Sequence, residues 1–311
     1  CISCMNCFNV NPFSYEQTNC SVNPFALREG SKRPIVQDGD GRLVAVIGAG
    51  PAGMEAAVTL KQRGFDVVVF DKRDEIGGNL HVAKKPPFKG KFEWAIDHYK
   101  SMAKKLNITM KLGKEVTAQE VLALKPYSIL VATGSNVISI PLEGLDQVQT
   151  VQAHDVLAND MQFANKKVVV IGGGITGLET ALYINRQGTN QVSVVDMLPE
   201  WPVDMLDMRY QNEALLEVRH CNDQGVALFY NNKVVKFADG KLFIESTKDG
   251  EVKELPADVI VLSVGVKPND ALWQELLASG HPSVWKAGDA IATGKINKAV
   301  LHGSKFGYSL N

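Results

Sequence analysis

The sequence predicts an α/β fold with two similar strand–turn–helix units in a chain of 311 residues. An apolar run leads into a glycine-rich turn twice, at 44–53 and again at 168–177. An aspartate ends the next apolar run each time: Asp71 and Asp196 stand 18 and 19 positions after the last glycine. This spacing is typical of Rossmann-like dinucleotide-binding domains. We therefore expect two such domains, the second inserted in the first, after an irregular cysteine-rich loop.

Hydrophobic periodicity and turn residues predict the elements in order along the chain. Runs of β-branched residues indicate strands, and apolar positions three or four apart indicate helices. The expected order is strand 43–47, helix 52–63, strand 66–70, helix 90–106, strand 127–132, strand 167–171, strand 191–195, an antiparallel meander from the runs 226–230, 233–237 and 241–246, strand 259–264, a strand from 284 and a terminal helix from about 295.

Composition excludes several functional classes. The net charge is −1, and no lysine–arginine block is present to follow a phosphate backbone, so nucleic acid is not an expected partner. No apolar run approaches the roughly 20 residues that cross a bilayer, and no signal-like segment is evident. Four of the five cysteines crowd the first twenty positions, unlike an evenly stapled disulfide scaffold. We expect a protein of a reducing compartment, the cytoplasm.

The sequence around the first turn favours FAD there. Gly77 and Gly78 allow a backbone to approach a flavin closely. Asp289, directly after Gly288, suits a ribityl hydroxyl. A helix that begins near Lys295 would place its N-terminus where it stabilises the negative charge of reduced flavin.

The second turn is then expected to bind a nicotinamide dinucleotide. Asp196 would repel a 2′-phosphate and hydrogen-bond a ribose hydroxyl, which favours NADH over NADPH. Arg209 could fold back and reverse this preference. Glu179, on the following helix, either faces the nicotinamide amide or is an ordinary exposed helix residue.

The N-terminal cysteines follow the pattern C-x2-C-x2-C-x12-C, at Cys1, Cys4, Cys7 and Cys20. Four thiolates in this spacing can hold a [4Fe–4S] cluster, and zinc also accepts four cysteines. A C-x-x-C dithiol is less favoured, because neither glycine turn has a cysteine pair beside it. Cys221 stands alone and is expected to be a buried structural thiol.

Together these motifs resemble the C-terminal half of the NADH:flavin oxidoreductase family, which includes 2,4-dienoyl-CoA reductase, 2-enoate reductases and trimethylamine dehydrogenase. The resemblance covers nearly the whole chain. It rests on both glycine turns, the cysteine quartet, and the segments Val22-Asn23-Pro24, Arg28-Glu29, Ile76-Gly-Gly-Asn-Leu80, Ala83-Lys-Lys-Pro86-Pro87-Phe-Lys89, Ala132-Thr-Gly-Ser135 and Gly288-Asp289.

The resemblance implies a relay in which NADH reduces FAD, electrons pass through a [4Fe–4S] cluster, and FMN in an N-terminal TIM barrel reduces an activated C=C bond of an enoate or enoyl substrate. This chain lacks the barrel, which would be its partner within the parent polypeptide, and no residue is assigned a catalytic proton transfer. The spacing of Cys4 and Cys7 is that of trimethylamine dehydrogenase. Two alternatives stay open: a non-catalytic domain that holds ADP, and an electron-transfer protein similar to the glutamate synthase small subunit.

The expected domains and site residues follow from these assignments. Residues 1–30 form the iron–sulfur loop with ligands Cys1, Cys4, Cys7 and Cys20, 31–145 and 266–311 form the FAD domain, and 146–265 form the NAD(P)H domain. The expected FAD residues are Gly48, Gly50, Pro51, Ala52, Gly53, Asp71, Lys72, Gly78, Asn79, Leu80, Ala132, Thr133, Gly134, Gly288, Asp289, Lys295 and Ile296. The expected NAD residues are Gly172, Gly174, Ile175, Thr176, Gly177, Glu179, Asp196 and Gly265.

Overall fold

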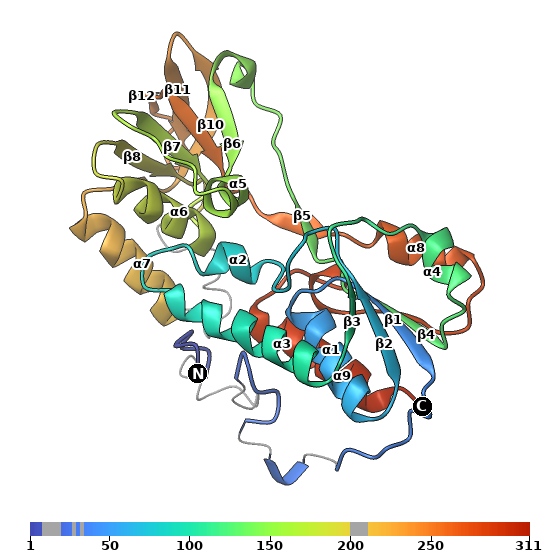
Figure 1. Cartoon of the computed structure of the whole chain (residues 1–311). Coiled ribbons are helices and arrows are strands. Elements are labelled where there is room, and N and C mark those ends of the chain that lie inside the picture. Colours follow the sequence, from blue (N-terminus) through green and yellow to red (C-terminus); the bar gives the residue numbers. More distant parts are fainter. Residues whose placement is uncertain (8–19, 27–28, 32–33, 200–210) are drawn as a thin grey trace.

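The computed structural model describes residues 1–7, 20–26, 29–31, 34–199 and 211–311, and contains two five-stranded parallel sheets (Figure 1). The first sheet has the order β15-β4-β1-β2-β3 and the second the order β6-β13-β7-β8-β9. The predicted α/β class with two Rossmann-like units is confirmed. The strands of the first unit are β1 (Leu43–Ile47), β2 (Asp66–Phe70), β3 (Thr109–Lys111), β4 (Ser128–Val131) and β15 (Val284–Lys286), and those of the second are β6 (Gln149–Gln152), β7 (Lys167–Ile171), β8 (Gln191–Val195), β9 (Ala227–Phe229) and β13 (Val259–Leu262).

Side chains that alternate along the strands of the first sheet enter two separate cores. Val44 and Val46 pack with α1 (Pro51–Gln62), α3 (Glu93–Lys105) and α9 (Ile296–Ser309) on one face. Ala45 and Ile47 face the opposite core, which α4 (Ala118–Ala123) and α8 (Ala271–Ala278) cover. Because both faces are buried, the strands are continuous apolar runs, which is why the sequence revealed them.

The second sheet is covered differently on its two faces. Val168 and Val170 pack toward α5 (Ala153–Ala158), α6 (Ile175–Asn185) and α7 (Gln211–Asp223). Val169 and Ile171 pack toward the antiparallel sheet of β10 (Asn232–Ala238), β11 (Lys241–Ser246) and β12 (Val252–Pro256).

The predicted meander is partly wrong. The run 226–230 does not join β10 and β11, because its core, β9, pairs in parallel with β8 at the edge of the second sheet. The helix α7 provides the crossover that a parallel neighbour requires. The third meander strand is instead β12, whose polar, exposed pattern gave no strand signal.

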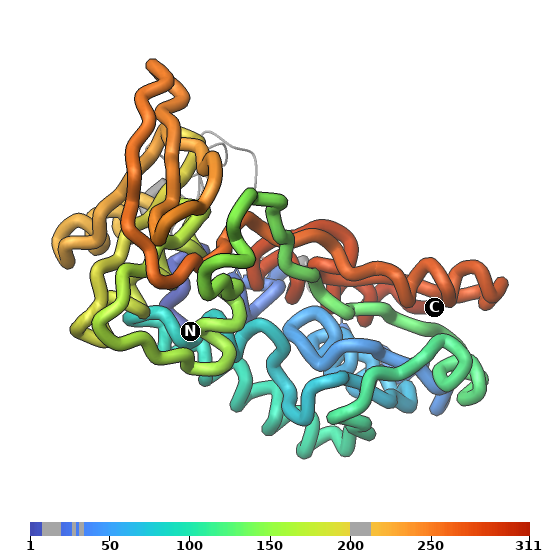
Figure 2. Tube along the Cα trace, turned by 90° about the horizontal axis from the view of Figure 1, so that it is seen from above, coloured from blue at the N-terminus to red at the C-terminus, as the bar shows by residue number. Residues whose placement is uncertain are grey.

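The two connections between the units run side by side. β5 (Ser135–Val137) and β14 (Val266–Pro268) form a two-stranded antiparallel sheet in which Val137 pairs with Val266. Figure 2 shows the green and orange-red connections passing between the two units. The shorter elements are α2 (Leu80–Ala83), η1 (Glu29–Ser31), η2 (Gly90–Phe92), η3 (Leu145–Gln147) and η6 (Gly288–Ala290). No helix within the described part of the chain is both long and apolar enough to span a bilayer.

Candidate functional site

The first glycine of each turn has the same backbone conformation, with a positive φ. Gly48 has φ +114°, and a Cβ atom there would lie 2.1 Å from the carbonyl oxygen of Ala132. Gly172 has φ +110°, and its Cβ would lie 2.2 Å from the carbonyl oxygen of Ser263. Only glycine fits such a position, because an L side chain would be strained and would collide with backbone. The turns at 48–53 and 172–177, hereafter the first and second loops, are therefore built alike.

The third glycine closes each loop onto its own helix. A Cβ at Gly53 or at Gly177 would lie 1.9 Å from the carbonyl oxygen of the first glycine of the same loop. The middle glycines differ, because a Cβ at Gly174 would meet nothing within 4 Å and one at Gly50 only the Cα of Gly78, at 3.9 Å. The open space beside the middle glycines fits a ligand that approaches the backbone closely, as a pyrophosphate does.

The middle glycines are also the N-caps of α1 and α6. Both have extended backbone, and neither helix start is capped by a side-chain hydrogen bond. The first N–H groups of a helix lack partners within the helix and carry partial positive charge. Each loop therefore directs helix N–H groups toward the space where an anion would bind.

The two aspartates are held by matching hydrogen bonds. Asp71 accepts the N–H of Ala49 at 2.7 Å on Oδ2 and the N–H of Arg73 at 2.8 Å on Oδ1. Asp196 accepts the N–H of Gly173 at 2.6 Å and that of Leu198 at 2.8 Å in the same way. Each carboxylate is thus fixed beside its loop and retains lone pairs that can accept from a ribose hydroxyl.

Several distant segments converge on the first loop. A Cβ at Gly78 would lie 2.8 Å from the Cα of Gly50, and one at Gly288 would lie 3.0 Å from the Cβ of Ala52. Asp289 accepts from the Ser135 hydroxyl at 3.2 Å and from the Gly294 N–H at 3.1 Å. Burial raises the pKa of the Asp289 carboxyl.

The remaining residues expected at the first loop are distributed around it. Thr133 follows Ala132, which contacts Gly48, and its hydroxyl donates to the carbonyl of Asn269 at 2.5 Å. Asn79 and Lys72 are exposed, whereas Leu80 is buried. Lys295 is the N-cap of α9, with Ile296 as its first residue, and Pro51 is the first residue of α1. Gly134 lies beyond Thr133, where its carbonyl accepts the N–H of Asn269 at 3.0 Å.

The other residues expected at the second loop share the start of α6 or the connection after β13. Ile175 and Thr176 form the first turn of α6, and Gly265, with φ +100°, follows β13. Arg209 lies outside the described residues, as does Arg28 of the N-terminal segment. The close approaches and hydrogen bonds thus bring Gly78, Ala132 and Asp71 to the first loop and Ser263 and Asp196 to the second.

Glu179 lies in an interface between the two units that the sequence did not reveal. It is only 7% exposed and forms an ion pair with Lys89 of the first unit. Lys89 also contacts Glu213 of α7 at 3.0 Å, and Glu213 contacts Lys295 at 2.6 Å. Two carboxylates of the second unit therefore alternate with two ammonium groups of the first.

The ionisable side chains of this network have pKa values shifted in different directions. Burial raises the pKa of Glu179 to about 7, because its share of one ammonium does not offset desolvation. Burial also opposes ionisation of Glu213, but Lys89 and Lys295 outweigh it and hold the pKa of that carboxyl below its usual range. Likewise the two carboxylates outweigh burial at Lys89 and raise its pKa. The two lysines therefore favour the ionised form of Glu213, whereas burial favours the protonated form of Glu179.

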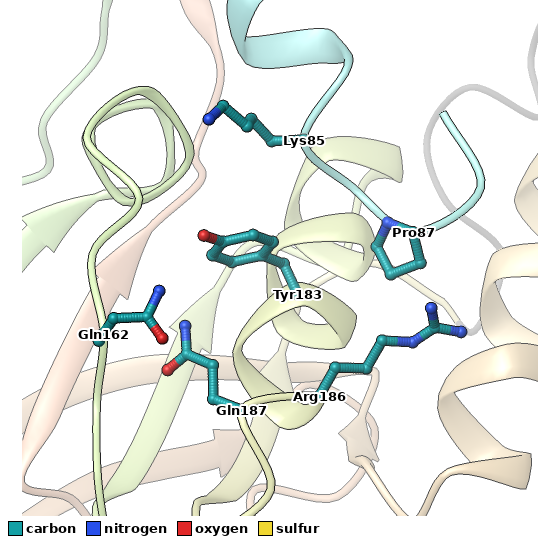
Figure 3. Close-up of a pocket in the computed structure, with 6 residues that line it drawn as sticks. All are labelled: Lys85, Pro87, Gln162, Tyr183, Arg186 and Gln187. Atoms are coloured by element: carbon teal, nitrogen blue, oxygen red, sulfur yellow. The ribbon is translucent and has the colours of Figure 1, made fainter. Parts of the chain in front are cut away.

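The same interface continues along α6 as a pocket of 370 Å³ (Figure 3). Lys85 forms an ion pair with Asp160, which also accepts from the Tyr183 hydroxyl at 3.1 Å. The Arg186 guanidinium lies 4.6 Å from the centre of the Phe88 ring. Residues 85–89 therefore hold the second unit at three successive places. The pocket is lined by Lys85, Pro87, Gln162, Tyr183, Arg186 and Gln187.

The structure does not gather the N-terminal cysteines into a metal site. Cys1 and Cys7 are exposed, and Cys4 donates to the Ser21 hydroxyl at 3.2 Å. Across the described ranges, no three His, Cys, Asp or Glu side chains form a group that could hold a metal ion. The thiols have the right chemistry for a cluster, but their arrangement does not fit one. Cys221 is buried as expected, and burial raises the pKa of its thiol to about 12.

The fold and the paired loops define a Rossmann-type oxidoreductase domain with two dinucleotide-binding loops. The chain belongs to the pyridine nucleotide-disulphide oxidoreductase family, which it matches over residues 42–300. It is 32% identical over 319 residues to an NADH oxidase of Thermoanaerobacter brockii, covering 100% of this chain and 47% of that protein.

Two further similarities concern reductases. A bilirubin reductase of Mediterraneibacter gnavus is 34% identical over 238 residues, which cover 76% of this chain and 36% of the relative. A solved structure of 2-naphthoyl-CoA reductase in complex with 2-naphthoyl-CoA superposes with a TM-score of 0.83 at 28% identity, over 94% of this chain and 44% of that one. The chain thus spans less than half the length of these relatives.

Proposed function

We propose that this chain is the NADH-to-FAD half of a larger reductase. Its two loops share one geometry, each with a fixed aspartate and a helix N-terminus beside an open middle glycine. This duplication is the observation that carries the proposal, because a protein with two such sites can hold a hydride donor and a hydride acceptor together. Bound flavin would supply the acceptor chemistry, and the protein supplies position and electrostatics.

We assign FAD to the first loop and the nicotinamide dinucleotide to the second. Gly78, Ala132 and Gly288 come from three separate segments and close around the first loop, as expected for a resident cofactor. Asp289 would bind a ribityl hydroxyl, and the α9 N-terminus after Lys295 would face the negative end of reduced flavin. Asp196, already oriented by two backbone N–H groups, would accept from the adenosine ribose and disfavour NADPH.

The rest of the larger protein is proposed from its relatives. The names of the relatives include a bilirubin reductase and a 2-naphthoyl-CoA reductase, and reduction of an activated C=C bond in an FMN-containing TIM barrel is the chemistry we propose for the parent polypeptide. Cys1, Cys4, Cys7 and Cys20 stay the proposed holders of a [4Fe–4S] cluster there. Because the structure does not bring these thiols together, the chemistry proposed for this chain ends at the flavin.

A pair of equivalent glycine substitutions tests the assignment of the two loops. Gly48→Ala should abolish FAD binding, because its Cβ collides with the Ala132 carbonyl. Gly172→Ala should keep the flavin absorbance but lose its bleaching by NADH under anaerobic conditions. Gly240→Ala is the matched control, since Gly240 has φ +73° but no atom within 4 Å of a Cβ, and it should change neither property.

Two outcomes would contradict the proposal. If Gly172→Ala loses the flavin while Gly48→Ala keeps it, the loops are assigned the wrong way round. If denaturation of the unaltered protein releases ADP and no FAD, the chain is instead the non-catalytic nucleotide-holding domain.

A further inference from the structure

The two loops differ at the residue between their first and middle glycines. In the first loop this residue is Ala49, which is fully buried. In the second loop it is Gly173, whose backbone does not require glycine, since its φ is not in the left-handed region. A neighbouring group, and not the backbone conformation, must therefore explain why position 173 is a glycine.

Tyr230 occupies the space that a side chain at Gly173 would need. A Cβ built there would lie 2.8 Å from the Cε1 atom of Tyr230 and 3.1 Å from the Cβ of Asp196. The Tyr230 hydroxyl donates to the carbonyl of Gly173 at 3.4 Å, while Asp196 accepts the N–H of Gly173 at 2.6 Å. Gly173 is thus held from both sides, and the ring and the carboxylate side chain are neighbours.

The first unit has a different residue at the position equivalent to Tyr230. Tyr230 follows Phe229, the β9 residue whose carbonyl accepts the N–H of Asp196 at 3.0 Å. In the first sheet the carbonyl of Lys111 accepts the N–H of Asp71 at 3.2 Å, and the next residue is Leu112. The first loop therefore combines alanine with leucine, whereas the second combines glycine with tyrosine.

We propose that Tyr230 is a positioning residue for the nicotinamide dinucleotide, which it serves through Gly173 and Asp196. The inference rests on the proposed function of the second loop. By holding the Gly173 carbonyl and packing beside Asp196, the ring fixes the loop that receives the pyrophosphate relative to the carboxylate that reads the ribose. It does not act on the first loop, so its effect is confined to one of the two cofactors.

A double-substitution cycle tests this inference on the purified FAD-loaded protein, with ferricyanide as electron acceptor. Gly173→Ala should raise KM for NADH about tenfold with little change in kcat, because the ring must move. Tyr230→Leu should raise KM several-fold. The double variant has the alanine–leucine pair of the first loop. Its KM for NADH should therefore be lower than that of either single variant.

Tyr230→Phe keeps the ring and removes only the hydrogen bond, so KM should rise about twofold. FAD content should stay at the level of the unaltered protein in every variant, which a general structural defect would not allow. Unchanged KM in Gly173→Ala, or a double variant no better than either single one, would overturn the inference alone. Failure of NADH to react with the unaltered FAD-loaded protein would overturn the proposed function as well.

Discussion

Glu179→Gln should change how stability depends on pH. The Glu179 carboxyl has a pKa of about 7, raised by burial from its ordinary value of 4.5. A raised carboxyl pKa means that the folded state holds its proton more tightly than the unfolded state. The resulting stability is present below pH 4.5 and is lost as the pH rises through 7. Each pKa unit corresponds to about 1.4 kcal/mol, so this loss is on the order of 3 kcal/mol.

Glutamine is neutral at every pH and keeps an oxygen that can accept from Lys89. The free energy of unfolding of Glu179→Gln relative to the unaltered protein should therefore increase by on the order of 3 kcal/mol between pH 4.5 and pH 8. Urea unfolding followed by tryptophan fluorescence at several pH values measures this difference. The comparison removes the contributions of other titrating groups, such as Glu55, whose pKa burial also raises to about 7.

Glu213→Gln is the matched control with the opposite sign. The pKa of Glu213 is lowered, so its charge stabilises the fold at neutral pH, and that contribution is lost as the pH falls. Its neutralisation should destabilise the protein at pH 8 and have less effect in acid. If the free energies of unfolding of Glu179→Gln and of the unaltered protein change with pH in the same way, the raised pKa inferred for Glu179 is refuted.

Three further predictions concern other parts of the molecule. Asp196→Ala should lower the ratio of flavin reduction rates with NADH and NADPH about tenfold, and an unchanged ratio would show that this carboxylate does not read the ribose. Gly303→Ala should destabilise the protein by about 1 to 3 kcal/mol, because its Cβ would lie 2.1 Å from the carbonyl oxygen of Ala52 and push α9 off α1. Thermal unfolding measures this loss of stability. Gly90→Ala is the control, because a Cβ at Gly90 meets nothing within 4 Å. In the larger parent protein, Cys4→Ser should lower the content of bound iron and Cys221→Ser should not; unchanged iron in Cys4→Ser would contradict the proposed cluster.

The parts of the structure that the sequence predicted are those set by local patterns. Strands buried on both faces leave apolar runs, so β1, β2 and β8 begin and end where expected. The strand β11, which has one buried face, is instead located by the alternation of its side chains. The position of β9 at the edge of the second sheet was predicted wrongly, because periodicity identifies a strand but not the strand that pairs with it. Pairing depends on the crossover through α7, a tertiary choice that the run itself does not encode.

The candidate site likewise has parts that the sequence predicted and parts that it did not. Spacing located both loops and their aspartates, since the turn and the strand that follows it fix that geometry locally. The partnership of Lys89 with Glu179 was missed because it joins residues of different units, and only the packing of α6 against residues 85–89 reveals it. The role of Tyr230 was hidden for a similar reason, although glycine in place of the alanine of the first loop was a visible signal.

Anaerobic titration of the FAD-loaded protein with NADH tests the central claim most directly. The account predicts that about one equivalent of NADH bleaches the flavin absorbance completely, because both dinucleotides are held by the same chain and the hydride passes between them. A flavin spectrum that stays unchanged with excess NADH, in protein shown to contain FAD, would contradict it.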